Sequence, residues 1–256
     1  MTLDKVWPSA ADAVADIPHH ASLAVGGFGV CGVPDGLIAA LCDRDVADLH
    51  IISNNCGVDD YGLGVLLSAG RISRITASYV GENSEFARRY LSGQLEVELI
   101  PQGTLAERLR AGGVGIPGFY TPAGVGTPVG DGGLPWRYGP EGSVLKASPP
   151  KEVRVFNGRP HLLETAIRAD YALVHAEISD RHGNLVFNKT AMNFNPLAAM
   201  AGRTTIVEAE RLVEPGALDP AQVHLAGIFV QRVVLTGPQA KRIEKRTVRA
   251  SEGFTS

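Results

Sequence analysis

Three glycines near the start of the chain have the spacing of a phosphate-binding turn. They are Gly27, Gly29 and Gly32, in the stretch AVGGFGVCGVPDG. A G-x-G-x-x-G spacing between a strand and a helix is typical of loops that hold the pyrophosphate of a dinucleotide. Asp48 precedes the next predicted strand, and that strand ends without the carboxylate that would hold a ribose. The surroundings therefore argue against NAD, and a glycine-rich turn without a ligand is the simpler alternative.

Side-chain amides lie at the ends of two predicted strands. Asn54 and Asn55 end the predicted strand LHIISNN, and Gln102 follows LEVELIP. Ligand sites of α/β proteins gather beyond the carboxyl ends of the strands. We therefore expect these amides either to donate hydrogen bonds to a ligand or to brace their own loops.

Other residues with reactive side chains have simpler interpretations. His175 and His182 lie on different elements and have no cysteine or carboxylate at metal-ligand spacing, so we expect histidines of the core or surface and no metal site. Cys31 has no evident base beside it, and we interpret it as a small packing residue. The stretch DRHGN, Asp180–Asn184, predicts a tight turn between strands.

Short apolar strands alternate with helical segments along the chain. Glycine, capping residues and apolar spacing of 3 to 4 residues indicate where the helices begin and end, and Thr104-x-x-Glu107 predicts a capping box. Alternation of this kind predicts βαβ units and a mostly parallel sheet covered on both faces. The predicted strands are Ser22–Gly27, Leu49–Asn55, Ser73–Val80, Leu95–Ile100, Tyr171–Asp180, Thr204–Val213 and Ile228–Leu235, and the predicted helices are Pro34–Arg44, Asn83–Gly93 and Thr104–Gly113.

The segment Ala111–Gly142 is rich in glycine and proline and also carries four aromatic residues. We expect an ordered surface loop there, because loops of this length are functional or disordered and the aromatic side chains argue against disorder. A hairpin turning at Asn157-Gly158 is predicted to follow. No linker is evident, so residues 1–256 are predicted to form a single domain that ends in a basic tail.

Composition narrows the class of protein. Hydrophobic residues make up 45% and charged residues 20% of the 256 residues, and the net charge is −3. These values give no reason to expect nucleic acid or a membrane surface as a partner. Three cysteines at irregular spacings and the lack of a signal-like or long apolar segment predict a cytoplasmic protein with free thiols.

Long stretches of the chain, in order, resemble one family. The unit from Leu23 to Pro34, Leu-Ala-Val-Gly-Gly-Phe-x-x-x-Gly-x-Pro, is similar to the signature of the family I CoA-transferases, and in particular of the A (α) subunits that act with 3-oxoacids. The family usually begins this motif with an Asp/Asn-Gly turn, where this chain has His19-His20. Further similar stretches are SNNCG, the run from SYVGENSEF to AGVGT, ADYALVHAEISDRHGNLVF and NFNP.

The resemblance implies a three-layer α/β/α sandwich and a loop that binds the coenzyme A thioester. That loop is made of Gly26, Gly27, Phe28, Gly29, Val30, Cys31 and Gly32. Its glycines let the backbone approach an anionic or carbonyl oxygen closely, and the start of the following helix adds positive potential. Phe28 is expected beside the ligand or, equally, in the core.

The resemblance also implies a ping-pong reaction with a glutamyl-CoA intermediate. The nucleophilic glutamate of the family lies on the B subunit, so no carboxylate of this chain is predicted to be the nucleophile. Glu82 is predicted to brace its loop. Asn54, Asn55 and Gln102 match family positions that line the active site, and they are predicted to donate to the thioester or acceptor oxygens.

Three alternatives for the reaction stay open. Transfer from succinyl-CoA to acetoacetate is favoured, transfer to 3-oxoadipate is the second, and ring-opening hydrolysis of a CoA ester that uses Glu82 is the third. The expected partner is a B subunit, in a heterodimer or its dimer, with part of the contact on Ala111–Gly142. No tightly bound cofactor is expected.

Overall fold

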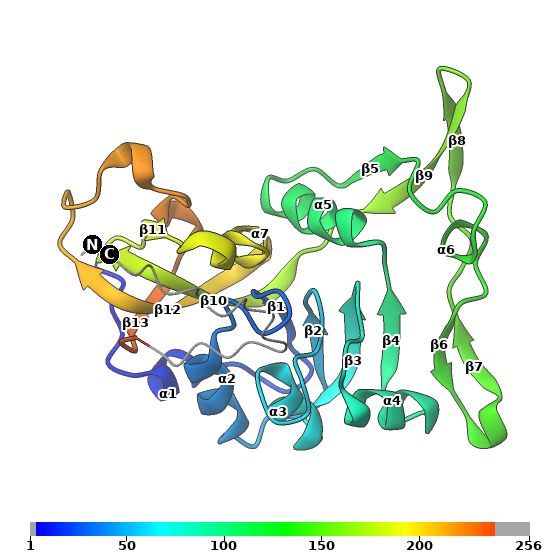
Figure 1. Cartoon of the computed structure of the whole chain (residues 1–256), viewed down its shortest axis with the longest axis horizontal. Helices are drawn as coiled ribbons and strands as arrows, with labels where there is room; N and C mark the ends of the chain where they lie inside the picture. The colour runs from blue at the N-terminus through cyan, green and yellow to red at the C-terminus, as the bar shows by residue number, and fades with distance from the viewer. Residues whose placement is uncertain (1–3, 239–256) are drawn as a thin grey trace, which may run out of the picture.

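Parallel strands form the centre of the fold, and their order places β1 in the middle of the sheet. The computed structural model describes residues 4–238. In this range the strands follow the order β13-β12-β10-β1-β2-β3-β4, each parallel to its neighbour, and β11 pairs antiparallel with β10 (Figure 1). The chain therefore builds outward in one direction from β1 to β4 and in the other from β10 to β13. The strands are β1 Ser22–Val25, β2 Leu49–Ile52, β3 Ile72–Ala77, β4 Glu96–Leu99, β10 Ala169–Asp180, β11 Leu185–Val186, β12 Gly202–Val213 and β13 Arg232–Leu235.

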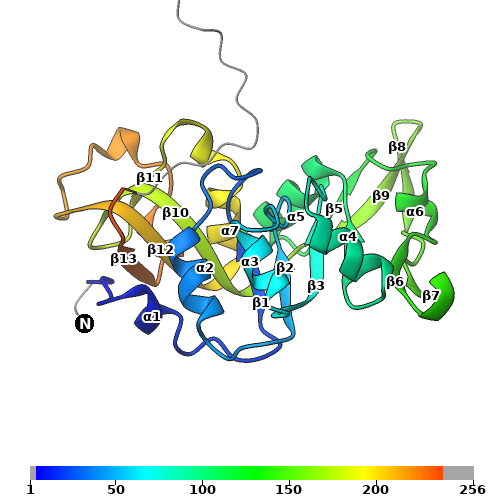
Figure 2. The same ribbon diagram turned by 60° about the horizontal axis from the view of Figure 1, so that its bottom comes forward.

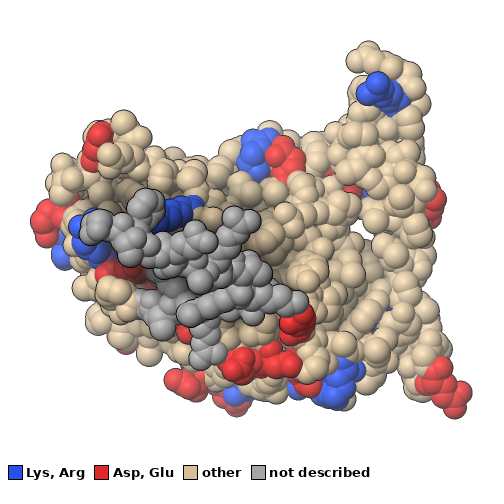
Figure 3. Space-filling view, in the orientation of Figure 1, with Lys and Arg blue, Asp and Glu red and all other residues tan. Residues whose placement is uncertain are grey.

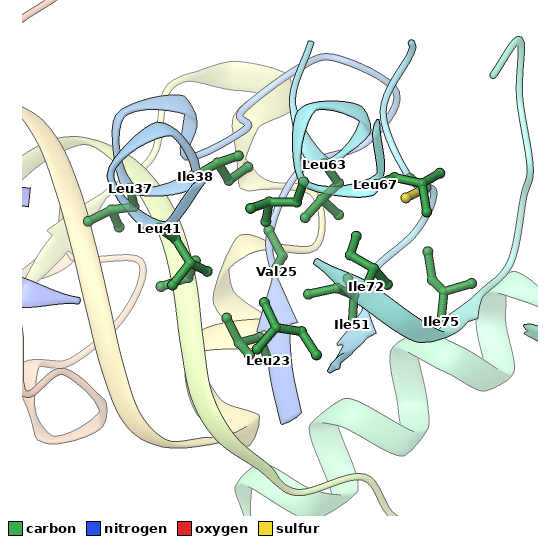
Figure 4. Packing of buried hydrophobic residues seen from close by; sticks show 14 of the residues in the cluster. Leu23, Val25, Leu37, Ile38, Leu41, Ile51, Leu63, Leu67, Ile72 and Ile75 are labelled. Carbon is green, nitrogen blue, oxygen red and sulfur yellow. The ribbon is translucent and has the colours of Figure 1, made fainter. Parts of the chain in front are cut away.

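One face of this sheet is covered by α2, α3 and α4. Alternate residues of the short strands point to opposite faces, so Leu23 and Val25 of β1 face these helices. Figure 4 shows Leu37 and Leu41 of α2 and Leu63 of α3 directed at the same cluster. The helices on this face are α2 Asp35–Cys42, α3 Leu63–Ser68 and α4 Ser84–Leu91, with the short α1 Ala10–Ala13 beside them.

The opposite face is covered by α5 and α7, which span Gln102–Gly113 and Asn195–Ala201. Leu105 and Leu109 of α5 pack in a second buried cluster with Ala24 of β1 and Val174 of β10. Two helical layers thus enclose one mostly parallel sheet. The predicted α/β/α sandwich is confirmed.

A long excursion leaves the sheet after α5 and returns at β10. It contains β5 Gly118–Thr121, α6 Pro128–Asp131, β6 Pro135–Tyr138, β7 Val144–Ala147, β8 Val153–Phe156 and β9 Arg159–Thr165. These form a three-stranded and a two-stranded sheet that extend beside β4, and we call this part the arm (Figure 2). The prediction of a surface loop at Ala111–Gly142 is therefore wrong, because this segment contains β5, α6 and β6. Its glycines and prolines mark turns between short paired strands, which local composition cannot distinguish from a loop.

Several predicted boundaries need correction. The helix α5 begins at Gln102, with Pro101 before it, so Thr104 is a buried residue inside the helix and caps nothing. Glu107 pairs with Arg110 on the same helix. The last strand begins only at Arg232, because Gly227–Phe229 form a 3₁₀ turn.

Other local predictions are confirmed. Asn83 accepts a hydrogen bond from the Phe86 N–H at 2.8 Å and caps α4. Asn157 and Gly158 have φ of +50° and +75° and form the tight turn between β8 and β9. The Asp180 carboxylate accepts from two backbone N–H groups of the DRHGN turn, those of His182 and Asn184.

The surface of the described part mixes charges of both signs. In the view of Figure 3, groups of acidic and basic side chains lie mainly around the rim, and other residues form most of the visible described face. Among residues 4–238, no helix combines the length and the apolar character that crossing a bilayer requires. The predicted basic tail, from residue 240 onward, lies outside the described residues.

Candidate functional site

The glycine loop joins β1 to α2 where the strand order changes direction. Strands β1 and β10 lie side by side at this point, and the chain continues from them to opposite edges of the sheet. A crevice at such a switch point is the usual ligand site of an open α/β sheet. The sequence places the loop of residues 26–32 at this position.

The loop folds into a tight turn that needs glycine. Phe28 and Cys31 exchange backbone hydrogen bonds of 3.0 and 2.9 Å, so the turn residues are Gly29 and Val30. Gly29 has φ of +58°, a conformation that costs a β-branched residue most. A Gly29→Val change would therefore strain the turn itself and could not report on ligand binding alone.

Asn195, the first residue of α7, is hydrogen-bonded to one end of the loop and packs against the other. Its Nδ2 donates to the Gly32 carbonyl at 2.9 Å, and a Cβ at Gly26 would lie 1.9 Å from its Oδ1. The same Oδ1 accepts the backbone N–H of His175 at 3.0 Å. The sequence analysis missed this role, although the stretch NFNP contains Asn195.

An open depression lies beside the loop. It has a volume of about 440 Å³ and is lined by Phe28, Cys31, Lys189, Thr190, Met192 and Asn193. Phe28 is 45% exposed and stacks on Phe194 with ring centres 6.4 Å apart, so the expectation of a core phenylalanine was wrong. The Cys31 Sγ lies 3.0 Å from the Thr190 hydroxyl.

Two of the three predicted amides, Asn54 and Gln102, meet beyond the carboxyl ends of β2 and β4. The Asn54 Nδ2 donates to the Gln102 Oε1 at 3.3 Å and to the Ser78 hydroxyl at 2.9 Å. Asn55 is buried, and its Nδ2 has no hydrogen-bond partner within the described residues. A buried donor of this kind is rare in proteins, because leaving it unpaired costs about 1–3 kcal/mol.

The amide cluster and the glycine loop are neighbours. Ser53, which precedes the cluster, donates its hydroxyl to the carbonyl of Val25, the last residue of β1, at 2.9 Å. A Cβ at Gly62, beyond β2, would lie 3.3 Å from the side chain of Val33, beyond β1. The carboxyl ends of the parallel strands therefore carry both a glycine-rich backbone loop and a set of amide donors.

Glu82 lies exposed on the bend between β3 and α4. The neighbouring Asn83 braces this segment by donating to the Cys56 carbonyl at 3.1 Å and capping α4. The proposed bracing role of Glu82 stays a prediction.

A charged group occupies the start of α2. The N–H of Leu37 donates to the Oε2 of Glu208 at 2.9 Å, and Glu208 is fully buried. In a dinucleotide fold the pyrophosphate lies at this helix start. The carboxylate takes that position, which argues further against NAD and also removes the positive potential expected there for a ligand.

His175 lies between two carboxylates. Its Nδ1 is 2.9 Å from the Glu208 Oε1, and its Nε2 is 3.1 Å from the Glu210 Oε1. Burial lowers the pKa of His175, but hydrogen bonds and charge from both glutamates outweigh it and raise the pKa above 6.5. His182, by contrast, is a residue of the DRHGN turn.

Comparison with known proteins bears on the whole chain. Residues 8–236 match the model of a family described as Coenzyme A transferase. A Mycobacterium bovis protein, named as the A subunit of a probable succinyl-CoA:3-ketoacid coenzyme A transferase, is 63% identical over 247 residues, which is 96% of this chain and 100% of that protein. The human mitochondrial succinyl-CoA:3-ketoacid coenzyme A transferase 2 is 50% identical over 97% of this chain but only 48% of its own length.

A solved structure shares the fold. The acyl-CoA transferase YdiF of Escherichia coli O157:H7, determined as a thioester complex with CoA, superposes with a TM-score of 0.77 at 25% identity. The alignment covers 93% of this chain and 48% of that chain. This chain therefore spans about half the length of both the human and the YdiF polypeptides.

Proposed function

Because the chain belongs to the coenzyme A transferase family, we propose that it is one half of an enzyme that moves CoA from succinyl-CoA to a 3-oxoacid. The bacterial relative, which is slightly shorter than this chain, is named as an A subunit, and the human relative of the same activity name is about twice as long. Both facts support a second chain that supplies the other half.

The proposed reaction is a double displacement on a glutamate of the partner. The glutamate carboxylate attacks the succinyl-CoA carbonyl, which gives a succinyl-glutamyl anhydride and CoA thiolate. The thiolate then attacks the glutamyl carbonyl of the anhydride. Succinate is the leaving group, and CoA is now bound to the glutamate as a thioester. The acceptor carboxylate attacks this thioester and reverses the sequence, so acyl-CoA is released and the glutamate is restored.

This chain contributes donors and a backbone cradle. Negative charge develops on a carbonyl oxygen in each addition step, and preorganised amides stabilise it. Asn54 and Gln102 are hydrogen-bonded to each other and can share that role, and Asn55 follows Asn54 in the chain. The N–H groups of Gly26, Phe28 and Cys31 are engaged within the protein, so the ligand would be bound by other backbone groups of the loop.

The observation that carries the proposal is the buried Nδ2 of Asn55, which has no hydrogen-bond partner among residues 4–238 and follows in the chain Asn54, whose Nδ2 donates to Gln102. A ligand oxygen or a group of the partner chain would satisfy it. Its position at the carboxyl edge of the sheet, next to the glycine loop, favours the ligand.

Acetoacetate is the favoured acceptor, in keeping with the long match to relatives named as A subunits. Transfer to 3-oxoadipate is the alternative. A ring-opening hydrolase would need Glu82 as an essential carboxylate, whereas the proposed transferase assigns Glu82 only a bracing role. The reaction needs the CoA thioester as substrate and no further cofactor.

The partner is a B subunit, in a heterodimer or a dimer of heterodimers. We place part of the contact on the arm, which contains most of the predicted contact segment Ala111–Gly142 and, beyond that segment, exposes several apolar side chains: Val144, Leu145, Val153, Val155 and Phe156. A cytoplasmic location is consistent with the three free cysteines.

The test is reconstitution. The chain is co-expressed with its partner, and CoA transfer from succinyl-CoA is followed with acetoacetate and with 3-oxoadipate in separate reactions. Turnover that requires both chains and prefers acetoacetate supports the proposal. Thermal stabilisation by NADH rather than by CoA would contradict it.

A further inference from the structure

A buried polar network that the proposed reaction does not use links β10, β12 and α7 to the glycine loop. We propose that Glu208 is a positioning residue: acting through His175, Asn195 and the first turn of α2, it fixes the conformation of the glycine loop. The inference rests on the proposed function only in taking this loop as the CoA-binding element.

Glu208 caps α2 from a distant part of the chain. The first N–H groups of a helix have no partner within the helix, and Pro34, which precedes α2, provides no side-chain hydrogen bond. The Glu208 Oε2 accepts the N–H of Leu37 at 2.9 Å instead. The carboxylate of a β12 residue therefore anchors the helix that follows the loop.

The other oxygen of Glu208 reaches the opposite side of the loop through His175. The two residues are direct neighbours in the parallel register of β10 and β12, and Oε1 lies 2.9 Å from the imidazole Nδ1. The charged groups that act on the ring are Glu208 and Glu210, both on β12. Because both ring nitrogens face carboxylate oxygens, both donate when the ring is protonated.

Asn195 completes the connection. Its Oδ1 accepts the N–H of His175, and its Nδ2 donates to the carbonyls of Gly32 and Ala191, each at 2.9 Å. The bonds thus run from Leu37 through Glu208, His175 and Asn195 to Gly32 and enclose the end of the loop. All three side chains are buried, so the network does not depend on solvent.

A carboxylate is required at position 208 because it accepts two hydrogen bonds at once. Glutamine has nearly the same size but offers one oxygen and one N–H₂ group. While His175 carries a proton on Nδ1, Glu208→Gln leaves either the Leu37 N–H or the His175 Nδ1–H facing a donor. The substitution therefore releases one end of the loop with little change in packing.

The experiment measures backbone hydrogen exchange in the complex with the partner chain, without substrate. In Glu208→Gln, the amides between Gly27 and Leu37 should exchange about tenfold faster than in the wild type. The matched control is Asp170→Asn, which removes a carboxylate that accepts from Ser22 N–H at 3.0 Å at the opposite end of β1. Equal loop exchange in Glu208→Gln and the wild type would overturn the proposal.

Two further measurements keep the result interpretable. In Glu208→Gln the KM for succinyl-CoA should rise severalfold while kcat changes less, whereas general destabilisation would lower the amount of active enzyme and leave KM unaltered.

Asn195→Asp, which keeps an acceptor for His175 but loses the donor to Gly32, should accelerate loop exchange in the same way; unaltered exchange would overturn the proposal even if Glu208→Gln failed to fold.

The proposed function is tested separately by adding CoA to the wild type. Slower exchange of the loop amides supports CoA binding there. Unchanged exchange with CoA contradicts that binding role, while faster exchange in Glu208→Gln still supports the positioning role.

Discussion

Replacing Gly26 with alanine should destabilise the chain through a single clash. The new Cβ would lie 1.9 Å from the Oδ1 and 2.6 Å from the Cγ of Asn195, so that side chain must move. Asn195 is fully buried and makes hydrogen bonds to His175, Gly32 and Ala191. Losing three bonds at a net value of about 1 kcal/mol each lowers the free energy of unfolding by about 3 kcal/mol.

The assay is urea unfolding at one fixed protein concentration, followed by circular dichroism. The matched control is Gly103→Ala in α5, where a Cβ meets no atom within 4 Å. That change should stabilise the chain by about 0.5–1 kcal/mol, because alanine loses less backbone entropy in a helix.

A double-mutant cycle isolates the cause. In Asn195→Ala the hydrogen bonds are already lost and the obstructing atoms are gone, so adding Gly26→Ala should cost much less than ~3 kcal/mol more. A Gly26→Ala variant as stable as the wild type would refute the described packing. Full additivity in the double variant would refute Asn195 as the cause.

Four further predictions concern single side chains. Gln102→Ala should lower kcat by ~10²–10³ with little effect on the KM for succinyl-CoA, as expected for a lost oxyanion donor and measurable by steady-state kinetics. Glu82→Gln should leave turnover unchanged, and a loss of turnover would favour the hydrolase alternative. Thr104→Val should raise the free energy of unfolding by roughly 0.5–1 kcal/mol, because the buried Thr104 hydroxyl has no partner within the described residues, and urea unfolding checks this. Burial, and then the nearby Arg74, lower the pKa of His50 to about 4. The unfolded chain therefore binds the proton more readily between about pH 4 and 6.5, and the wild type should lose on the order of 2–3 kcal/mol more stability than His50→Gln as the pH falls through this window, measured by urea unfolding at each pH.

Local sequence patterns were sufficient to predict most strands of the central sheet. The apolar runs ending at Val25 and Ile52 are short enough to be buried parallel strands, and Asn54 and Asn55 lie just beyond the end of the second run. Parallel order then brings Asn54 and Gln102 together, although they are 48 residues apart. The positions of these two amides could be predicted because both residues lie just beyond a strand, while their roles in a site stay predictions.

The rest depends on contacts that no local pattern encodes. Glu208 is an acidic residue in an apolar stretch, and this pattern could have indicated a buried carboxylate. Its partner could not be predicted, because Leu37 is 171 residues away in the chain. Ala111–Gly142 has the composition of a loop, and only pairing with the later β9 makes β5 a strand. The single-domain boundary and the individual roles of the loop residues stay predictions.

The most direct test of the central claim is the mass of each chain after the complex has reacted with succinyl-CoA in the absence of acceptor. The account predicts that the partner chain gains the mass of a CoA thioester and that this chain keeps its own mass. A thioester on this chain, at Glu82 or any other carboxylate, would contradict the assignment of the nucleophile to the partner.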